Sequence, residues 1–352
     1  MRRRDLLSSA LAAGALGTGS ARALTGRGGW PEAWECWKAA FLDPEGRVVD
    51  ALQGEASHSE GQGWAMLLAV AFDDRDAFDR LRAWTETHLA VRQDPLLAWR
   101  WRPGEGVADY NNATDGDLFF AWAHLRAARR FGDPALARRA RAVAEAIDRI
   151  LVVAAPGGDT LLLRPAAERF AAPGAETINP SYLMPLALHD LAASFGLPRL
   201  ARAAADGEAG LAELAAPGLV PDWATRDDAG WSRPAGLSGA YGYDALRVPL
   251  YLIWSGRFAH PAVARVRALL AATPEATPVR AEAGTGRVIE TSDAPGYAAV
   301  AALVTCSGAA VPAATIPGWT ASQAYYPATL HLLAALAASE AAPHCLGDGA
   351  GP

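Results

Sequence analysis

The chain has 352 residues, a hydrophobic fraction of 51% and a net charge of −6 at pH 7. This length is sufficient to bury a large core, and the acidic balance argues against a nucleic-acid-binding surface. Beyond the N-terminus, no stretch is long and apolar enough to suggest a membrane span. The three cysteines, Cys36, Cys306 and Cys345, are far apart. They show no zinc spacing and no disulfide framework, and at most one bridge can form.

The first 23 residues have the pattern of an export signal. Three arginines at positions 2–4 precede an apolar stretch over 6–16, and Ala21-Arg22-Ala23 provides a small-x-small cleavage site. The arginines also fit a twin-arginine signal, so both export routes stay open. We expect a mature chain that begins near Leu24 and a periplasmic or secreted protein.

Two kinds of helix alternate along the rest of the chain. Six segments are apolar on every side, which is typical of a helix surrounded by neighbours: residues 61–72, 118–128, 182–193, 245–254, 297–304 and 328–337. Between them lie amphipathic segments over 78–88, 133–150, 198–214 and 261–270. The second of these begins with Asp133 as a helix cap and Pro134 at the first helical position.

This alternation predicts a closed ring of helical hairpins, with inner helices lining the axis and outer helices covering them. We therefore predict an all-α fold, an (α/α)6 barrel of about six helix pairs. Two stretches look extended: residues 161–163, and a hairpin over 279–289 around Gly284-Thr285-Gly286. No linker is apparent, so residues 24–340 are expected to form one domain. We predict a disordered tail over 341–352.

Polar clusters lie immediately before the inner helices. They are Glu60, then Asn111 to Asp117, then Asn179 to Tyr182, then Tyr241 to Asp244 with Arg247 one turn later, and last Ser322 to Tyr326. If the inner helices run parallel, these clusters meet at one rim of the ring. The sequence thus predicts one site that combines carboxylates with aromatic side chains.

Each candidate also has a purely structural interpretation. Thr114 and Asp115 could be helix caps, and Asp244 could form a solvated i, i+3 ion pair with Arg247. Tyr325 and its neighbour Tyr326 could serve packing alone. The seven histidines show no metal-binding spacing, and the serines lack a Gly-x-Ser-x-Gly setting. We predict no metal and no cofactor.

Carboxylates and aromatic rings together favour a carbohydrate substrate. Tryptophan faces pack against sugar rings, and several of the twelve tryptophans lie near the polar clusters: Trp64, Trp99, Trp101, Trp122, Trp223 and Trp231. For Trp84 and Trp254 we expect core packing. Two working acids suffice for polysaccharide hydrolysis, because one protonates the glycosidic oxygen while the other activates water.

In these segments the chain resembles family-8 glycoside hydrolases, most closely the endo-β-1,4-glucanases that accompany bacterial cellulose synthase. The resemblance covers nearly all of the mature chain, and its most specific segments occur in the family's order: residues 59–64, 113–117, 179–182, 221–223 and 243–247. It implies an (α/α)6 barrel that inverts the anomeric centre. One departure is Gly63-Trp64-Ala65, where many relatives have Gly-Tyr-Gly, and we expect it to alter only the wall of the site.

The resemblance also implies roles for individual residues. Glu60 would be the general acid, Asp244 the general base, and Asp115 the acid that holds the sugar at the cleavage point. Arg247 would orient Asp244, and Tyr182 would lie against the sugar or the attacking water. Further substrate-binding candidates are Trp101 and Trp223 as sugar platforms, and Asn179, Asp117, Tyr243 and Tyr325.

These roles set physical requirements. Glu60 must be protonated at working pH and Asp244 ionised, with roughly 6.5–9.5 Å between them for a water molecule, whereas about 5 Å would indicate a retaining enzyme. The expected partners are a β-1,4-glucan and a cellulose synthase complex, and we expect a monomer. Xylan or chitosan as substrate, a non-catalytic glucan-binding protein, and a polysaccharide lyase are the alternatives.

Overall fold

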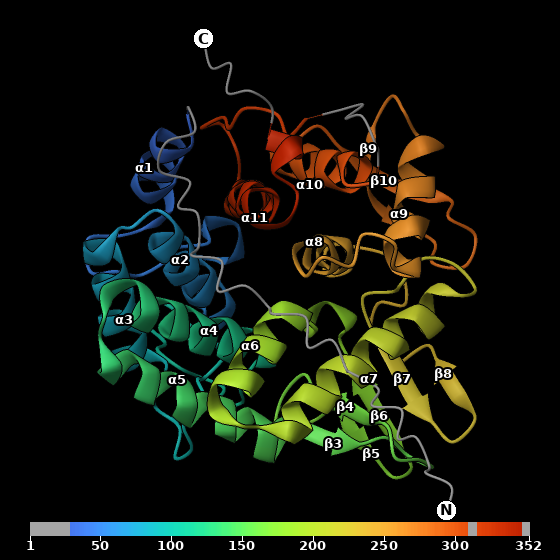
Figure 1. The fold of residues 1–352 in the computed structure, drawn as a ribbon, viewed down its shortest axis with the longest axis horizontal. Helices are drawn as coiled ribbons and strands as arrows, with labels where there is room; N and C mark the ends of the chain where they lie inside the picture. The colour runs from blue at the N-terminus through green and yellow to red at the C-terminus, as the bar shows by residue number, and fades with distance from the viewer. Residues whose placement is uncertain (1–28, 309–314, 347–352) are drawn as a thin grey trace, which may run out of the picture.

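Helices arranged in a ring dominate the computed structural model, which describes residues 29–308 and 315–346 (Figure 1). The inner helices are α2 (Ser59–Ala71), α4 (Thr114–Phe131), α6 (Pro185–Phe195), α8 (Arg247–Trp254), α10 (Pro295–Cys306) and α11 (Tyr325–Ala341). The outer helices are α1 (Trp30–Phe41), α3 (Arg75–His88), α5 (Pro134–Ala146), α7 (Pro198–Ala215) and α9 (Pro261–Ala271). Consecutive inner helices contact one another and α11 contacts α2, which closes the ring. The predicted (α/α)6 barrel is confirmed.

Apolar side chains on every face explain why the inner helices lie where they do. Nearly all residues of α2 and α11 are buried, whereas α3 and α5 bury only one stripe. The predicted cap of α5 is present, because the Asp133 side chain accepts a hydrogen bond from the Ala135 N–H. Trp84 and Trp254 are core residues, as expected.

The third inner helix begins later than predicted. Asn179 caps a short 3₁₀ turn, η3 (Pro180–Tyr182), and the chain is extended at Leu183 and Met184 before α6 begins. Pro185 sets this boundary, because proline lacks an N–H and disfavours a helical residue before it. The polar segment over 179–182 is therefore a separate turn that faces the start of α8.

Short antiparallel strands occur in the segments between the helices. The two predicted stretches are confirmed: β4 (Leu161–Leu163) pairs with β3 (Val152–Ala154), and β9 (Thr277–Ala281) with β10 (Val288–Ser292). The structure adds a pair, β1 (Ser57–His58) with β2 (Arg100–Trp101), and a four-stranded sheet of β5 (Ala171–Ala172), β6 (Ala175–Ile178), β7 (Ala224–Asp227) and β8 (Gly230–Ser232). Three short helical segments complete the elements outside the site: η1 (Ala51–Gln53), the π-helical η2 (Ile147–Leu151) and η4 (Pro343–Leu346).

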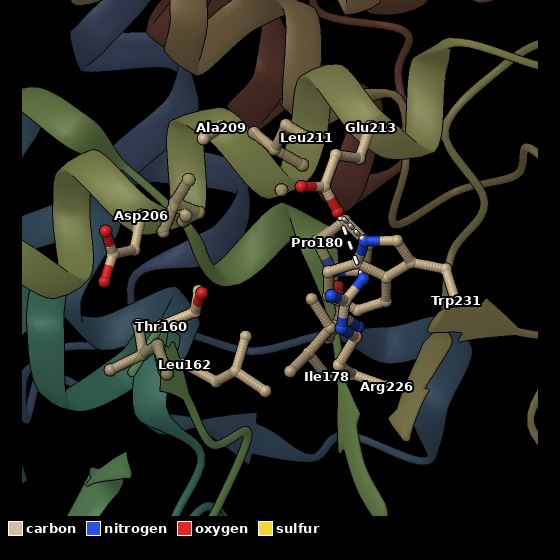
Figure 2. A pocket seen from close by; sticks show the side chains of 15 residues that line it. Thr160, Leu162, Ile178, Pro180, Asp206, Ala209, Leu211, Glu213, Arg226 and Trp231 are labelled. Atoms are coloured by element: carbon tan, nitrogen blue, oxygen red, sulfur yellow. Dashed lines mark hydrogen bonds and ion pairs between the residues drawn. The ribbon is translucent and has the colours of Figure 1, made fainter. Parts of the chain in front are cut away.

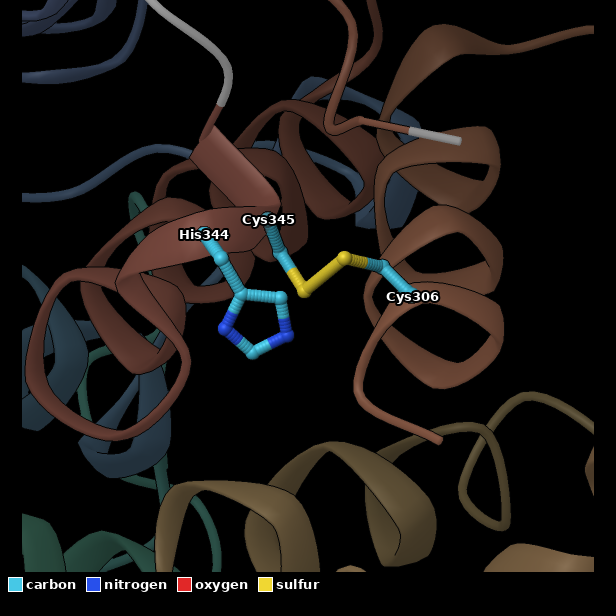
Figure 3. A group of neighbouring side chains, drawn as sticks. All are labelled: Cys306, His344 and Cys345. Atoms are coloured by element: carbon cyan, nitrogen blue, oxygen red, sulfur yellow. A yellow bond between two sulfur atoms is a disulfide. The ribbon is translucent and has the colours of Figure 1, made fainter. Parts of the chain in front are cut away.

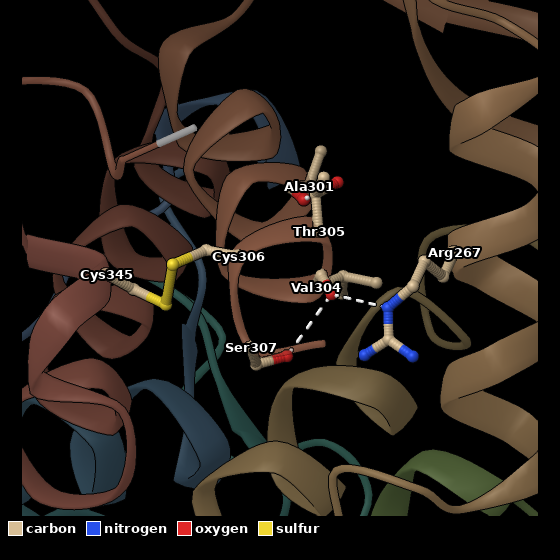
Figure 4. The surroundings of a disulfide bond; sticks show 7 residues. All are labelled: Arg267, Ala301, Val304, Thr305, Cys306, Ser307 and Cys345. Atoms are coloured by element: carbon tan, nitrogen blue, oxygen red, sulfur yellow. Dashed lines mark hydrogen bonds between the residues drawn. A yellow bond between two sulfur atoms is a disulfide. The ribbon is translucent and has the colours of Figure 1, made fainter. Parts of the chain in front are cut away.

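A disulfide fastens the C-terminal segment to the ring. Cys306 at the end of α10 is joined to Cys345 in η4, with their Cα atoms 5.7 Å apart (Figure 3). The same end of α10 is held by Arg267, whose Nε donates to the Val304 carbonyl at 3.1 Å (Figure 4). The predicted disordered tail is wrong for residues 341–346, because both cysteines are buried against α10 and α11.

Some predictions lie outside the described residues, namely the export signal over 1–23 and the end of the tail over 347–352. Cys36 is the odd thiol and is exposed. Among the helices that the structure describes, none combines the length and apolar character needed to cross a bilayer.

Removing the disulfide should destabilise the fold. The bridge joins residues 39 apart, and closing a loop of that size restricts the unfolded chain by about 4 kcal/mol. A double variant, Cys306→Ser with Cys345→Ser, should lose about that much free energy of unfolding in urea titrations. Cys36→Ser is the matched control and should unfold like the wild type. Equal stability of the double variant and the wild type would contradict this prediction.

Candidate active site

A buried guanidinium organises the site. Arg247, in the first turn of α8, has only 3% of its side chain exposed. Its Nη1 is in direct contact with Glu60 and lies 3.6 Å from the Asp115 carboxylate, while its Nη2 lies 2.8 Å from Asp244. The starts of α2, α4 and α8 therefore meet, as the sequence predicts. The Asp244–Arg247 pair exists, but it is not a solvated surface pair.

The three carboxylates differ in their access to solvent. The side chains of Glu60 and Asp244 are 23% and 36% exposed, whereas that of Asp115 is 3% exposed. Two carboxylates can thus reach a bound molecule, and the third lies beneath them with Arg247. This is the arrangement expected for an acid and a base supported by a buried charge pair.

Close packing of α4 on α2 positions Glu60. A Cβ at Gly116 would lie 2.0 Å from the Ser59 Oγ and 2.8 Å from the Glu60 backbone nitrogen. Only glycine permits this approach, which brings the neighbouring Asp115 to the same guanidinium. On the other side the Ser59 N–H donates to the Trp99 carbonyl at 3.0 Å, so the start of α2 is held from two directions.

A ring of hydrogen bonds holds Asp244. The Asn179 Nδ2 donates to the Asp244 Oδ2 at 3.0 Å, the Ser181 Oγ donates to the Asn179 Oδ1 at 2.7 Å, and the Arg247 Nη2 donates to the Ser181 Oγ at 2.7 Å. Since the Asn179 oxygen is occupied by Ser181, its amide nitrogen must face Asp244. Asn179 is buried and orients Asp244, and its contact with substrate stays a prediction. Sequence reasoning missed Ser181, although it lies within the conspicuous segment over 179–182.

Burial raises the carboxylate pKa values at this site. It raises the pKa of Asp115 to about 7. It also raises the pKa of Asp244 to about 7, with a further upward contribution from the charge of Asp222, while hydrogen bonds from Asn179 and Trp223 act in the opposite direction. Asp244 is therefore mainly ionised only above about pH 7, which limits where it can act as a base.

Aromatic side chains surround Arg247 and Asp244. The Tyr182 ring centroid is 5.9 Å from the Arg247 guanidinium carbon, and Tyr182 meets Trp223 edge-on at 6.2 Å. Trp223 is half-buried and stacks on Phe170 at 5.2 Å. Tyr182 and Trp223 thus lie next to Asp244, where the sequence places them. Contact with sugar remains a prediction for both.

Two further aromatic candidates retain exposed surface. Half-buried Trp101 lies in β2 beside the strand that leads to Glu60, with its ring edge-on to Trp84 at 5.6 Å. Tyr243 is 40% exposed, and its hydroxyl donates to Glu290 at 2.6 Å. Either side chain can still offer a ring face to a ligand.

Asp117 and Tyr325 do not fit the substrate-binding role predicted for them. Asp117 is fully buried, and its oxygens accept hydrogen bonds from the Leu97 N–H at 2.7 Å and the Asn112 side chain at 2.8 Å. Tyr325 is buried and packs edge-on against Phe41 at 5.7 Å. Both side chains therefore support the first turns of the inner helices.

Other expectations are corrected in the same way. Thr114 is not a helix cap, because its hydroxyl donates to the Arg164 carbonyl at 2.6 Å. Trp64 and Trp122 are fully buried, so neither forms the wall of the site or a sugar platform. Trp64 instead lies under Arg247, with the guanidinium carbon 5.4 Å from its ring.

A separate cavity lies behind the turn that holds Asp244. It encloses about 110 Å³ between α7 and the strands β4 and β6, and Asn179 and Pro180 form part of its lining (Figure 2). Glu213 and Arg226 face each other at one end. The cavity is thus distinct from the carboxylate site and reaches only the back of the turn that holds Asp244.

One group of residues in the described part of the chain has metal-binding spacing: Cys306, His344 and Cys345. Its two sulfur atoms are bonded to each other, and metal binding requires free thiolates. The group therefore cannot act as a metal site in this state. The absence of a catalytic metal stays a prediction.

Comparison with known proteins identifies the class. Residues 6–340 match glycosyl hydrolases family 8. The structure is similar to that of the endo-beta-1,4-glucanase CMCax from Acetobacter xylinum, with a TM-score of 0.79 and 32% sequence identity over 89% of this chain and 98% of that one. The chain belongs to glycosyl hydrolases family 8, and it is a glycoside hydrolase of the cellulase type.

Individual relatives support this class. A probable endoglucanase of Novacetimonas hansenii is 35% identical over 321 residues, which is 87% of this chain and 90% of the relative. An endoglucanase of Cellulomonas uda is 37% identical over 227 residues, which is 63% of each protein. The chain is therefore similar to endoglucanases over most of its length.

Asp115 should limit stability at alkaline pH. Its folded pKa of about 7 exceeds the ordinary value of 3.8, so the folded state binds this proton more tightly than the unfolded state. The resulting stabilisation is complete below about pH 3.8 and is lost as the pH rises through 7. Asparagine does not titrate, so an Asp115→Asn variant does not lose this stabilisation as the pH rises. Its melting temperature relative to the wild type should therefore rise from pH 5 to pH 8.

Thermal unfolding of both proteins at the two pH values tests this prediction. Asp117 is a reference for the effect of burial alone on the pH dependence of stability. Burial also raises its pKa to about 7, although it lies away from the exposed carboxylates. Asp115→Asn should lower glucan hydrolysis as well, because the site loses a charge beside Arg247. A constant difference in melting temperature across the two pH values would contradict the prediction.

Proposed function

We propose that the protein cleaves β-1,4-glucan chains internally by an inverting mechanism. The observation that carries this proposal is the pair of partly exposed carboxylates, Glu60 and Asp244, held by one buried guanidinium. An acid and a base at one site are what glycoside hydrolysis requires. Endoglucanase relatives that share the fold support β-1,4-glucan as the substrate.

Each carboxylate would carry one proton transfer. Glu60 donates its proton to the glycosidic oxygen as the bond from that oxygen to the anomeric carbon breaks. Asp244 accepts a proton from water, whose oxygen bonds to the anomeric carbon from the opposite face. The new chain end then has inverted configuration. Asp244 ends protonated and Glu60 ionised, so a proton must return through solvent before the next turnover.

Arg247 sets a condition for this cycle. A neighbouring cation favours the ionised form of a carboxylate, yet Glu60 must hold a proton to act as the acid. We therefore expect bound substrate to separate Glu60 from Arg247. Arg247 then keeps Asp115 and Asp244 as its partners. Asp115, which lies beneath the exposed acids, would accept a sugar hydroxyl and hold the ring at the cleavage point.

A role outside the cytoplasm fits the covalent structure. The Cys306–Cys345 bridge is a structural disulfide, and such bonds persist in oxidising compartments. Together with the signal pattern over 1–23, this supports export to the periplasm or beyond. We further propose that a monomeric enzyme trims glucan during bacterial cellulose synthesis. That step rests on the resemblance described above.

Neutralising either exposed acid should abolish turnover. Glu60→Gln cannot donate a proton, and Asp244→Asn cannot accept one, so each variant should lose at least 10²–10⁴-fold of the rate, which is the range of general acid–base catalysis. The measurement is release of reducing ends from carboxymethylcellulose, xylan and chitosan. Glu145→Gln on the outer helix α5 is a matched control with unchanged activity expected.

Each outcome of this assay decides between functions. Cleavage of the cellulose derivative alone, lost in both variants, supports the endoglucanase. Cleavage of xylan or chitosan instead keeps the mechanism and changes the substrate. Wild-type activity in either variant would refute the assignment of that acid. Binding without cleavage by the wild-type protein would favour a non-catalytic glucan-binding protein.

A further inference from the structure

Asp222 is a buried acid that the mechanism above does not use. It lies just before β7, only 7% exposed, in the segment Pro221-Asp222-Trp223. We propose that Asp222 is a positioning residue for the catalytic base: it holds the loop that carries Asp244 and places a second negative charge beside it. This inference rests on the proposed function, because it assumes that Asp244 is the base.

The hydrogen bonds of Asp222 converge on the loop over 238–245. Its Oδ1 accepts from the Ala245 N–H at 2.9 Å, and its Oδ2 accepts from the Ser238 Oγ at 2.8 Å. The N–H groups of Gly242 and Asp244 bond to the same carboxylate. Its own N–H donates to the Ala240 carbonyl at 2.7 Å. One side chain thus fixes the backbone on both sides of Asp244.

Gly242 shows how tightly this loop is built around the carboxylate. A Cβ at position 242 would lie 2.5 Å from the Asp222 Oδ2. The backbone can wrap around the acid only because this residue is glycine. The close approach orients several N–H dipoles toward one buried anion, which favours its ionised form. Burial raises the pKa of Asp222, and these donors act in the opposite direction by favouring the charged form on which the proposal depends.

That charge acts directly on the base. Among the neighbours of Asp244, Asp222 contributes most after burial itself to raising the Asp244 pKa. Asn179 and Trp223 oppose it by donating hydrogen bonds to the Asp244 carboxylate. The position of Asp244 between a like charge and several donors gives the enzyme a base that titrates near neutral pH.

Two other acids near Asp244 can change charge as well: Asp115, and the proposed acid Glu60, which shares Arg247 with Asp244. The other titratable groups that face Asp244 or Asp222 are Arg247, Tyr182, Tyr241, Tyr251 and Tyr326. Burial raises the pKa of each of these tyrosines, so they stay neutral. Asp115 titrates near pH 7 as well. The informative quantity is therefore the shift between variants, not the absolute midpoint.

Asp222→Asn tests the charge while conserving the shape of the side chain. The amide oxygen can accept from the Ala245 N–H, and the amide nitrogen can donate to the Ser238 hydroxyl. Loss of the like charge should move the acidic limb of kcat/KM on carboxymethylcellulose to lower pH by about one unit. We also expect a lower kcat, since fewer acceptors hold the loop. Asp227→Asn in β7 removes a charge from the same sheet and should shift nothing.

Ser238→Ala is a milder variant that retains the acid. Ser238 is exposed, so the fold should tolerate the change. Losing one donor favours the protonated form of Asp222, and the acidic limb should move in the same direction by a smaller amount. If Asp222→Asn does not fold, this variant decides the test.

The outcomes separate the inference from the function on which it rests. If Asp222→Asn folds and the acidic limb of its kcat/KM profile stays at the wild-type pH, the proposed role of Asp222 is wrong, whatever the activity of the variant. If only Ser238→Ala folds, an unshifted acidic limb in that variant has the same meaning. Persistent wild-type activity of Asp244→Asn instead refutes the proposed function. A shift to higher pH in either variant would show that the Asp222 charge does not act on the base.

Discussion

The ion cluster around Arg247 is the interaction on which the rest of the site depends. A buried guanidinium is costly unless it is paired, and several carboxylates crowded together repel one another unless a cation lies between them. Here one side chain that is 3% exposed touches Glu60 and Asp244 and lies 3.6 Å from Asp115. Each acid comes from the start of a different inner helix. The closed ring is what brings these three helix starts to one point.

The site retains charge at some cost to the stability of the fold. Carboxylates with raised pKa values near 7 oppose folding at alkaline pH, and Asp115, Asp117 and the partly exposed Asp244 all have them. Such values are typical of places where protons are transferred. The protein offsets part of this cost locally through the donors that face each acid: Asn179 for Asp244, and the Leu97 N–H for Asp117.

The fold could be predicted because its signal is periodic and repeated. Segments apolar on every side alternate with amphipathic ones, and this pattern alone indicates inner and outer helices. The position of Glu60, Asp115, Asp244 and Arg247 followed because all four lie in or just before first turns at one rim. The direction of a side chain within a first turn is not encoded so simply, which is why Asp117 was expected to contact substrate although it is buried.

The sheet through β6 and β7 joins segments far apart in sequence, and the pairing of Cys306 with Cys345 depends on tertiary distance. Neither could be derived from local pattern.

The most direct test of this account is the configuration of the newly formed chain end. Proton NMR of a cello-oligosaccharide during its first minutes of hydrolysis distinguishes the two anomers before they interconvert. In the proposed mechanism water activated by Asp244 attacks opposite the bond that Glu60 cleaves, so the α-anomer should appear first. Initial appearance of the β-anomer would mean retention through a covalent intermediate, and it would contradict the assignment of Asp244 as a base that acts on water.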